Sequence, residues 1–203
     1  MHTSRRQLVL GMLVGGAWAG DLMPEALATT CPTNGTPEQF TPKKPKDPNP
    51  LEQELEKYPN CPYCGMNRRE HHASRHLIHF EDDLVDGVCS LHCAAISLAI
   101  NLDRGPKAIY VADFGEKQEP RPLVGTGSAV YLLGSTIQTA MTTRGKPGFA
   151  DRNVAAAMQT EKGGTVVDFE AALVAAYGDM AKDTLAIRKR RLERRKKMNQ
   201  GGE

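Results

Sequence analysis

The chain has 203 residues, a formal net charge of +2 and 40% hydrophobic residues, with few aromatics. No apolar run approaches the roughly 18 residues of a membrane-spanning helix, which argues against an integral membrane protein. The near-neutral total argues against nucleic-acid binding, but it conceals an asymmetry. The segment 182–198 holds nine Lys and Arg against two acids, a net of +7, which leaves the remainder at −5.

The N-terminus predicts export. Thr3 to Leu10 has the paired arginines, polar residue and apolar residues of a twin-arginine signal. An apolar stretch follows, and Ala26-Leu27-Ala28 forms an A-x-A cleavage site that would leave Thr29 first. An earlier cut near Ala19, a basic arm before a buried helix and lipidation of Cys31 are the alternatives. Because Cys31 lacks a small Gly, Ala or Ser before it, cleavage is favoured over lipidation, and the protein is expected in the periplasm.

Residues 29–59 follow the expected signal (1–28) and read as a linker. They contain seven prolines and several lysines, a composition that favours an extended chain. Leu51 to Glu56 is expected to form at most one helical turn. The globular domain is therefore predicted from Asn60 to 178, with a charged tail from 179 to 203.

Within the domain, the hydrophobic patterns predict short strands alternating irregularly with helices. Strands are expected at 77–80, 84–88, 108–112, 129–133 and 165–169, and helices at 90–102, 151–162 and 170–177. Ser90 is the expected N-cap of the first helix, and the pair Gly163-Gly164 ends the second. The order indicates an α+β fold and suggests two similar ββα(β) halves.

The tail is expected to form a separate charged helix over Met180 to Met198. Cations occupy most of its faces and leave Leu185 and Leu192 as a thin apolar stripe. A solvated tail is the plain interpretation. The functional alternative is attraction to an anionic membrane surface or to an acidic partner.

Four of the five cysteines form the spacing C-x2-C-x24-C-x3-C, at Cys61, Cys64, Cys89 and Cys93. This is close to the ligand spacing of structural zinc sites, and Gly65 would let the backbone turn so that N–H groups point at the sulfurs. Two disulfides would close the same loops. Thioredoxin-like redox chemistry is disfavoured, because a linker precedes the first pair where that chemistry needs a buried strand.

Methionine and histidine near the thiols widen the choice of metal. Met66 lies two residues after Cys64, and its thioether is a ligand that Cu(I) favours and zinc seldom uses. Met141 lies in a polar loop, where a packing role is less expected. His92 lies inside the second thiol pair and is the best imidazole candidate. Four other histidines in the region are expected on the surface or on strand faces: His71, His72, His76 and His79.

The ordered motifs of the domain resemble those of the NosL family. They are Cys61-Pro62-Tyr63-Cys64-Gly65-Met66, Asp86 to Ser90, Tyr110 to Asp113, Ala129 to Ser135, Met141, Gly148 to Ala150 and Lys162 to Gly164. These proteins are exported copper-binding accessory proteins of nitrous oxide reductase maturation. The resemblance implies two similar halves related to the organomercurial lyase-like fold. It also implies Cu(I) held by soft ligands at Cys64, Met66 and Met141.

The second thiol pair departs from the family pattern. Cys89-Ser90-Leu91-His92-Cys93 resembles a treble-clef-like metal site, and four thiolates around Cu(I) would suit storage or structure better than rapid delivery. No catalytic triad, phosphate-binding loop or paired acid motif indicates an enzyme. The sequence therefore predicts a Cu(I) accessory protein for a periplasmic metalloenzyme or metal transporter. The alternative is a partner-binding module stabilised by Zn²⁺ or by disulfides, without metal delivery.

Overall fold

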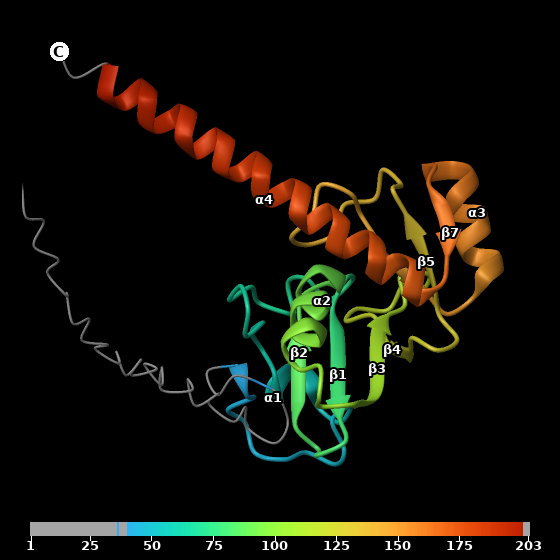
Figure 1. The fold of residues 1–203 in the computed structure, drawn as a ribbon. Helices are drawn as coiled ribbons and strands as arrows, with labels where there is room; N and C mark the ends of the chain where they lie inside the picture. Colours follow the sequence, from blue (N-terminus) through green and yellow to red (C-terminus); the bar gives the residue numbers. More distant parts are fainter. Residues whose placement is uncertain (1–35, 37–39, 201–203) are drawn as a thin grey trace, which may run out of the picture. The chain divides into compact units, whose positions relative to one another are not determined.

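The structure is a computed structural model that describes Thr36 and residues 40–200 (Figure 1). The predicted signal (1–28) and Cys31 lie outside the described residues. Among the residues that the structure describes, no helix combines the length and the apolar character that crossing a membrane requires.

The described chain alternates short strands and helices, which confirms the α+β class. The elements are α1 (Glu54–Lys57), β1 (His76–Phe80), β2 (Val85–Val88), α2 (Leu91–Ile100), β3 (Pro106–Ala112), β4 (Leu123–Gly125), β5 (Val130–Leu133), β6 (Gly148–Phe149), α3 (Arg152–Lys162), β7 (Thr165–Val167) and α4 (Phe169–Gln200). The sequence did not predict β4 or β6, because these strands of three and two residues each include a glycine and have fewer of the β-branched residues that indicated a strand at β7.

The strands form two antiparallel sheets with the orders β2-β1-β3-β4 and β6-β5-β7. In the first sheet β1 lies between β2 and β3, and helix α2 connects β2 to β3. In the second sheet β5 lies between β6 and β7, and helix α3 connects β6 to β7. This shared connectivity agrees with the two similar halves predicted from the sequence. The relation to the organomercurial lyase-like fold and the treble-clef-like form of the thiol cluster stay predictions.

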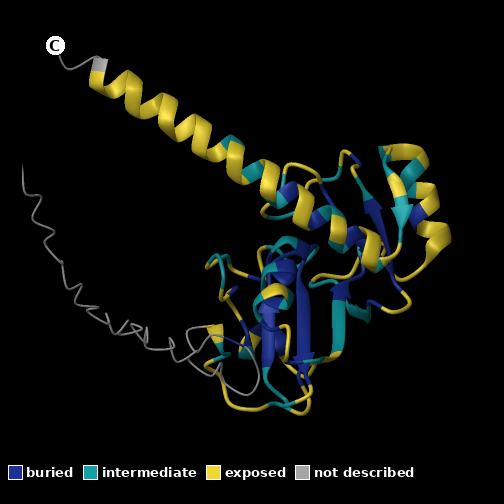
Figure 2. Cartoon of the chain, viewed as in Figure 1, coloured by how far each residue is buried: buried dark blue, intermediate teal, exposed yellow. Residues whose placement is uncertain are grey.

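Strand β1 is buried along its whole length, as Figure 2 shows for the centre of the first sheet. Successive side chains of a strand point to opposite faces. Accordingly, Ile78 and Phe80 pack in the main core beneath α2, whereas Leu77 packs with Tyr58 and Val85 on the other face. This burial on both faces explains why β1 has apolar side chains at two consecutive positions, Leu77 and Ile78.

Residues ahead of Asn60 also pack into the domain. Glu54 and Leu55 of α1 are buried, and the Tyr58 hydroxyl donates to Asp47 at 2.8 Å. Thr36 is buried as well, and its hydroxyl donates to the Asn101 side chain at 2.9 Å. The packed unit therefore extends N-terminally beyond the boundary expected at residue 60.

One continuous helix, α4, replaces the two helices expected on either side of residue 179. Ala172 and Ala176 are buried in the core that α2 also builds, and Asp179 is buried beside Lys146 with an N–O distance of 2.7 Å. These contacts hold the helical backbone through Gly178, where the sequence pattern alone indicated a change of segment.

Candidate metal centre

The first thiol pair lies in a tight hairpin that closes with a bridge between Asn60 and Asn67. The N–H of Cys61 donates to the Met66 carbonyl at 2.9 Å, and the N–H of Gly65 donates to the Cys61 carbonyl at 2.9 Å. Gly65 has a φ of 76°, a left-handed conformation that a side chain would strain. This turn brings the two sulfur atoms of the pair to the same side of the hairpin.

The second pair lies where β2 passes into α2. Ser90 occupies the N-cap position as predicted, but its side chain makes no capping bond. Cys89 precedes the helix and Cys93 lies in its first turn, so their side chains are about one turn apart. Both are completely buried. The hydroxyl of Ser74 donates to the Cys89 carbonyl at 2.9 Å and fixes this corner.

The four sulfur atoms of Cys61, Cys64, Cys89 and Cys93 all lie within 4.8 Å of one another. Two of the separations are 3.4 Å, from Cys64 to Cys89, and 3.8 Å, from Cys89 to Cys93. All four are free thiols. Sulfurs bound tetrahedrally to a metal at ~2.3 Å would be about 3.8 Å apart, so the cluster fits a single ion with little rearrangement.

The close approach of the thiols shifts their pKa values in opposite directions. The pKa of Cys61 is lowered well below its usual range, because the Cys89 and Cys93 thiols hydrogen-bond to its sulfur, with further help from backbone N–H groups. The same bonds raise the pKa of Cys89 and Cys93, and burial raises both further. Cys89 and Cys93 therefore keep their protons at neutral pH. Metal binding at this site must therefore release protons.

The buried carboxyl group of Asp86 holds the hairpin of the first thiol pair in place. Asp86 of β2 accepts hydrogen bonds from the Tyr63 hydroxyl at 2.5 Å and from the Ser97 hydroxyl at 2.6 Å. Burial raises the pKa of Asp86. Through Asp86, these bonds connect Tyr63, which lies between Cys61 and Cys64, to Ser97 of α2. The sequence analysis missed this role, although an acidic residue inside an apolar strand three positions before Cys89 was a usable signal.

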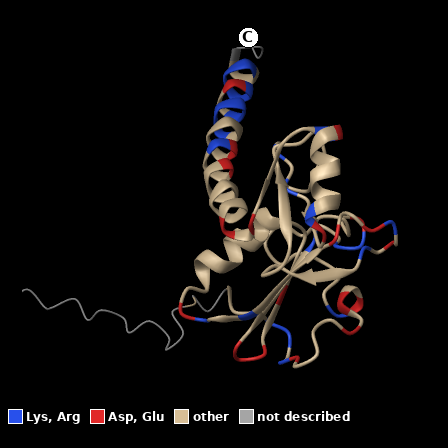
Figure 3. Ribbon diagram, turned by 90° about the vertical axis from the view of Figure 1, so that its right-hand side faces the viewer, with Lys and Arg blue, Asp and Glu red and all other residues tan. Residues whose placement is uncertain are grey.

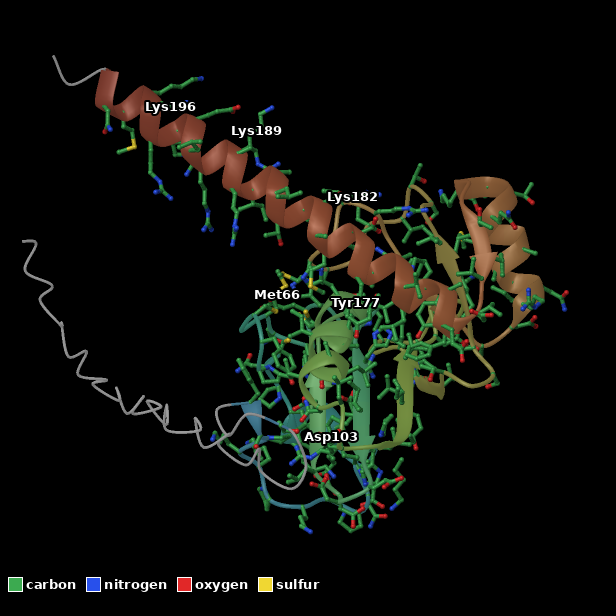
Figure 4. All side chains as sticks on the ribbon, viewed as in Figure 1. Met66, Asp103, Tyr177, Lys182, Lys189 and Lys196 are labelled. Carbon is green, nitrogen blue, oxygen red and sulfur yellow. The ribbon has the colours of Figure 1, made fainter. Side chains whose placement is uncertain are left out.

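The structure separates the other predicted ligands. Met66 is half-buried and packs against the same core cluster as the thiols, near the group of sulfur atoms in Figure 4. His92 lies between Cys89 and Cys93 in the sequence but outside the four-sulfur cluster. With Met141 it lines a separate cavity of about 230 Å³ that also includes Asp183 and Ile187 of α4. Met141 is 36% exposed.

Three other histidines have partners of their own. His76 is buried, and its ring nitrogens lie 3.1 Å from the Tyr131 hydroxyl and 3.0 Å from the Ser74 carbonyl. His79 pairs with Asp83 at 2.9 Å, and His72 accepts the N–H of Arg121 at 3.3 Å. None of these three belongs to the four-sulfur cluster.

Comparison with known proteins gives two findings. The family model for NosL matches residues 52–174, and no curated protein sequence matches the chain. The fold is similar to the crystal structure of the copper chaperone NosL from Shewanella denitrificans, with a TM-score of 0.50 and 20% identity. That similarity covers 63% of this chain and 96% of the other. The family match spans more than half of the chain, and the chain belongs to the NosL family.

Proposed function

We propose that this chain is an exported accessory protein that binds Cu(I) and passes it to a periplasmic metalloenzyme or metal transporter. The observation that carries the proposal is the group of four free thiols within 4.8 Å of one another. Thiolates and thioethers are the soft ligands that Cu(I) prefers. Membership of the NosL family supports copper as the cargo, and nitrous oxide reductase is the recipient that the family resemblance implies.

The burial of the thiols suggests how cargo would exchange. Cys61, Cys89 and Cys93 are buried, whereas Cys64 and Met66 are half-buried at the edge of the cluster. We assign these two residues to the side where copper enters and leaves. Exchange through the half-buried Cys64 thiolate and the neutral Met66 thioether needs no opening of the core. His92 and Met141 share the separate cavity and remain candidate ligands for copper in transit.

Zinc is the second candidate, favoured by the number and burial of the thiolates. Four thiolates leave a net charge of −2 around Zn²⁺ but −3 around Cu(I), and burying the larger uncompensated charge costs more. A closed zinc site would stabilise a domain with few aromatic residues. The chain would then be a partner-binding module without metal delivery.

Family membership agrees with the prediction that the chain is not an enzyme. The periplasmic location and the division into a signal (1–28), a linker (29–59) whose end packs on the domain through α1, a metal-binding domain (60–178) and a basic tail (179–203) that continues α4 are part of the proposal. Export through the twin-arginine route would let the thiols bind metal in the reducing cytoplasm, before an oxidising compartment favours disulfides.

The deciding experiment measures metal content and free thiols in protein purified anaerobically from the exported fraction. One copper per chain, with sulfur-only coordination by X-ray absorption, supports the first proposal. Cys64→Ser combined with Met66→Leu should then lower copper occupancy, while Met158→Leu, a methionine packed in the second core, should not. Zinc in place of copper, lost with Cys64→Ser or Cys93→Ser but unaffected by Met66→Leu alone, favours the second candidate. Disulfides without metal would refute both.

A further inference from the structure

The distal part of α4, from Arg188 to Asn199, extends away from the rest of the domain (Figure 1). Every residue from Arg188 to Asn199 is exposed, as Figure 2 shows. Lys and Arg crowd this part of the helix in Figure 3. Helices of this length are marginal alone, and neighbouring like charges weaken them further. We expect this exposed cationic surface to bind an anionic partner.

The exposed side chains form three parallel rows along one side of the helix. Residues seven apart lie nearly above one another in an α-helix. Lys182, Lys189 and Lys196 make the first row, which Figure 4 shows following the length of α4. Leu185 and Leu192, 68% and 53% exposed, make the second row. Arg188 and Arg195 make the third row.

The leucine row runs between the two basic rows. At 3.6 residues per turn, Leu192 lies about 40° from Lys196 on one side and about 40° from Arg188 on the other. Asp183 lies on another side of the helix, and Glu193 borders the lysine row about 40° beyond Lys189, on the side away from the leucines. The rows from Lys182 to Lys196 span about 21 Å and form one straight face, cationic at both edges and apolar in the middle.

The opposite side of the helix is already engaged. Asp183, Ile187 and Arg190 line the cavity that contains His92 and Met141. The Thr143 hydroxyl also lies 3.4 Å from the Asp183 carboxylate. The three-row face therefore points away from this cavity, and a partner on it would leave the surroundings of His92 and Met141 open.

We propose that the three-row face of α4 binds the surface of an anionic phospholipid bilayer. The long Lys and Arg side chains on both flanks can reach lipid phosphates while Leu185 and Leu192 lie at the interface. The straight face, with Leu185 and Leu192 exposed along its middle, fits a planar surface. A second copy of the helix would bring like charges together. The cations on the remaining sides keep the helix on the surface of the bilayer.

The test uses full-length, metal-loaded protein and sedimentation with phospholipid vesicles. The protein should bind vesicles that contain phosphatidylglycerol and not vesicles of phosphatidylcholine, and rising salt should release it. Replacing Lys182, Lys189 and Lys196 by Gln should lower the partition coefficient about 100-fold. The matched control replaces Arg190, Arg194 and Lys197 by Gln, which removes the same charge from the other side, and should lower it less than tenfold.

Three results would overturn the proposal. The first is an equal loss in the two triple variants, because the face would then have no special role. The second is equal binding to phosphatidylcholine. The third is no binding to either vesicle while the protein binds polyglutamate, which would indicate an acidic protein partner. Circular dichroism checks that the variants keep their helix, and unchanged metal content separates this result from any failure of the metal proposal.

Discussion

Replacing Glu54 by Ala should destabilise the domain strongly, because this carboxylate is shared by two buried guanidinium groups. Its oxygens lie 2.8 Å from Arg68 Nη2 and 2.8 Å from Arg75 Nε. The side chains are 8% exposed for Glu54, 0% for Arg68 and 4% for Arg75. Without Glu54, both cations would lie in the interior without a counterion.

Breaking a buried ion pair by removing one partner typically costs about 3–5 kcal/mol. The lower end is expected here, because Arg68 keeps hydrogen bonds to the carbonyls of Tyr58 at 2.6 Å and His76 at 3.1 Å. Burial already lowers the pKa of Arg68, which shows that its charge depends on compensation. Since small domains have about 5–15 kcal/mol of stability, a loss of about 3 kcal/mol is a large fraction.

Urea unfolding followed by circular dichroism measures the change in the free energy of unfolding. Glu56→Ala is the matched control, because Glu56 lies in the same short helix and pairs with Arg69 at the surface, with side chains 59% and 56% exposed. That exposed pair should contribute at most about 1 kcal/mol. Equal midpoints for the two variants would refute the reasoning and would place α1 in the linker that the sequence indicated.

Three further outcomes are expected from stability measurements. Complete burial lowers the pKa of His76 to about 3, below the ~6.5 of the unfolded chain, so its contribution is complete above pH 6.5 and is lost as pH falls. Urea midpoints should show about 2 kcal/mol lost from this group between pH 7 and 5. His76→Phe should lack that part of the pH slope, and identical slopes would contradict the prediction. Lys146→Met should cost about 3 kcal/mol in urea unfolding, because it removes the buried partner of Asp179 at 2.7 Å and leaves the exposed Arg144 at 3.6 Å, whereas Lys162→Met at an exposed pair should cost little. Anaerobic chelation should lower the melting temperature of metal-loaded protein. The loss of unfolding free energy should be about 4 kcal/mol if the free metal concentration before chelation was 1,000 times Kd. An unchanged melting temperature would show that folding of the cluster does not depend on metal.

Most elements of the domain follow from local patterns in the sequence. The runs around β1, β2, β3 and β5 have the apolar or alternating character of strands, and the spacing of apolar residues from Cys89 to Ile100 indicates α2. The motif C-x2-C and the motif C-x3-C each bring two sulfurs together by local geometry alone. Their common role as one cluster could be inferred because paired thiols with this spacing are typical of metal sites.

Contacts between distant segments decided the rest, because no local period records them. Glu54 follows a proline-rich stretch, and nothing in the sequence around it indicates that its carboxylate pairs with Arg68 and Arg75. His92 is adjacent to Cys93 in the chain, yet the direction of its side chain on α2 places it in a different cavity with Met141. The nine cations of the tail were visible from the first count of residues. The structure shows that these cations belong to one continuous helix, α4, and that one side of this helix contacts the domain. Only that arrangement shows which side of the tail is free to bind a partner.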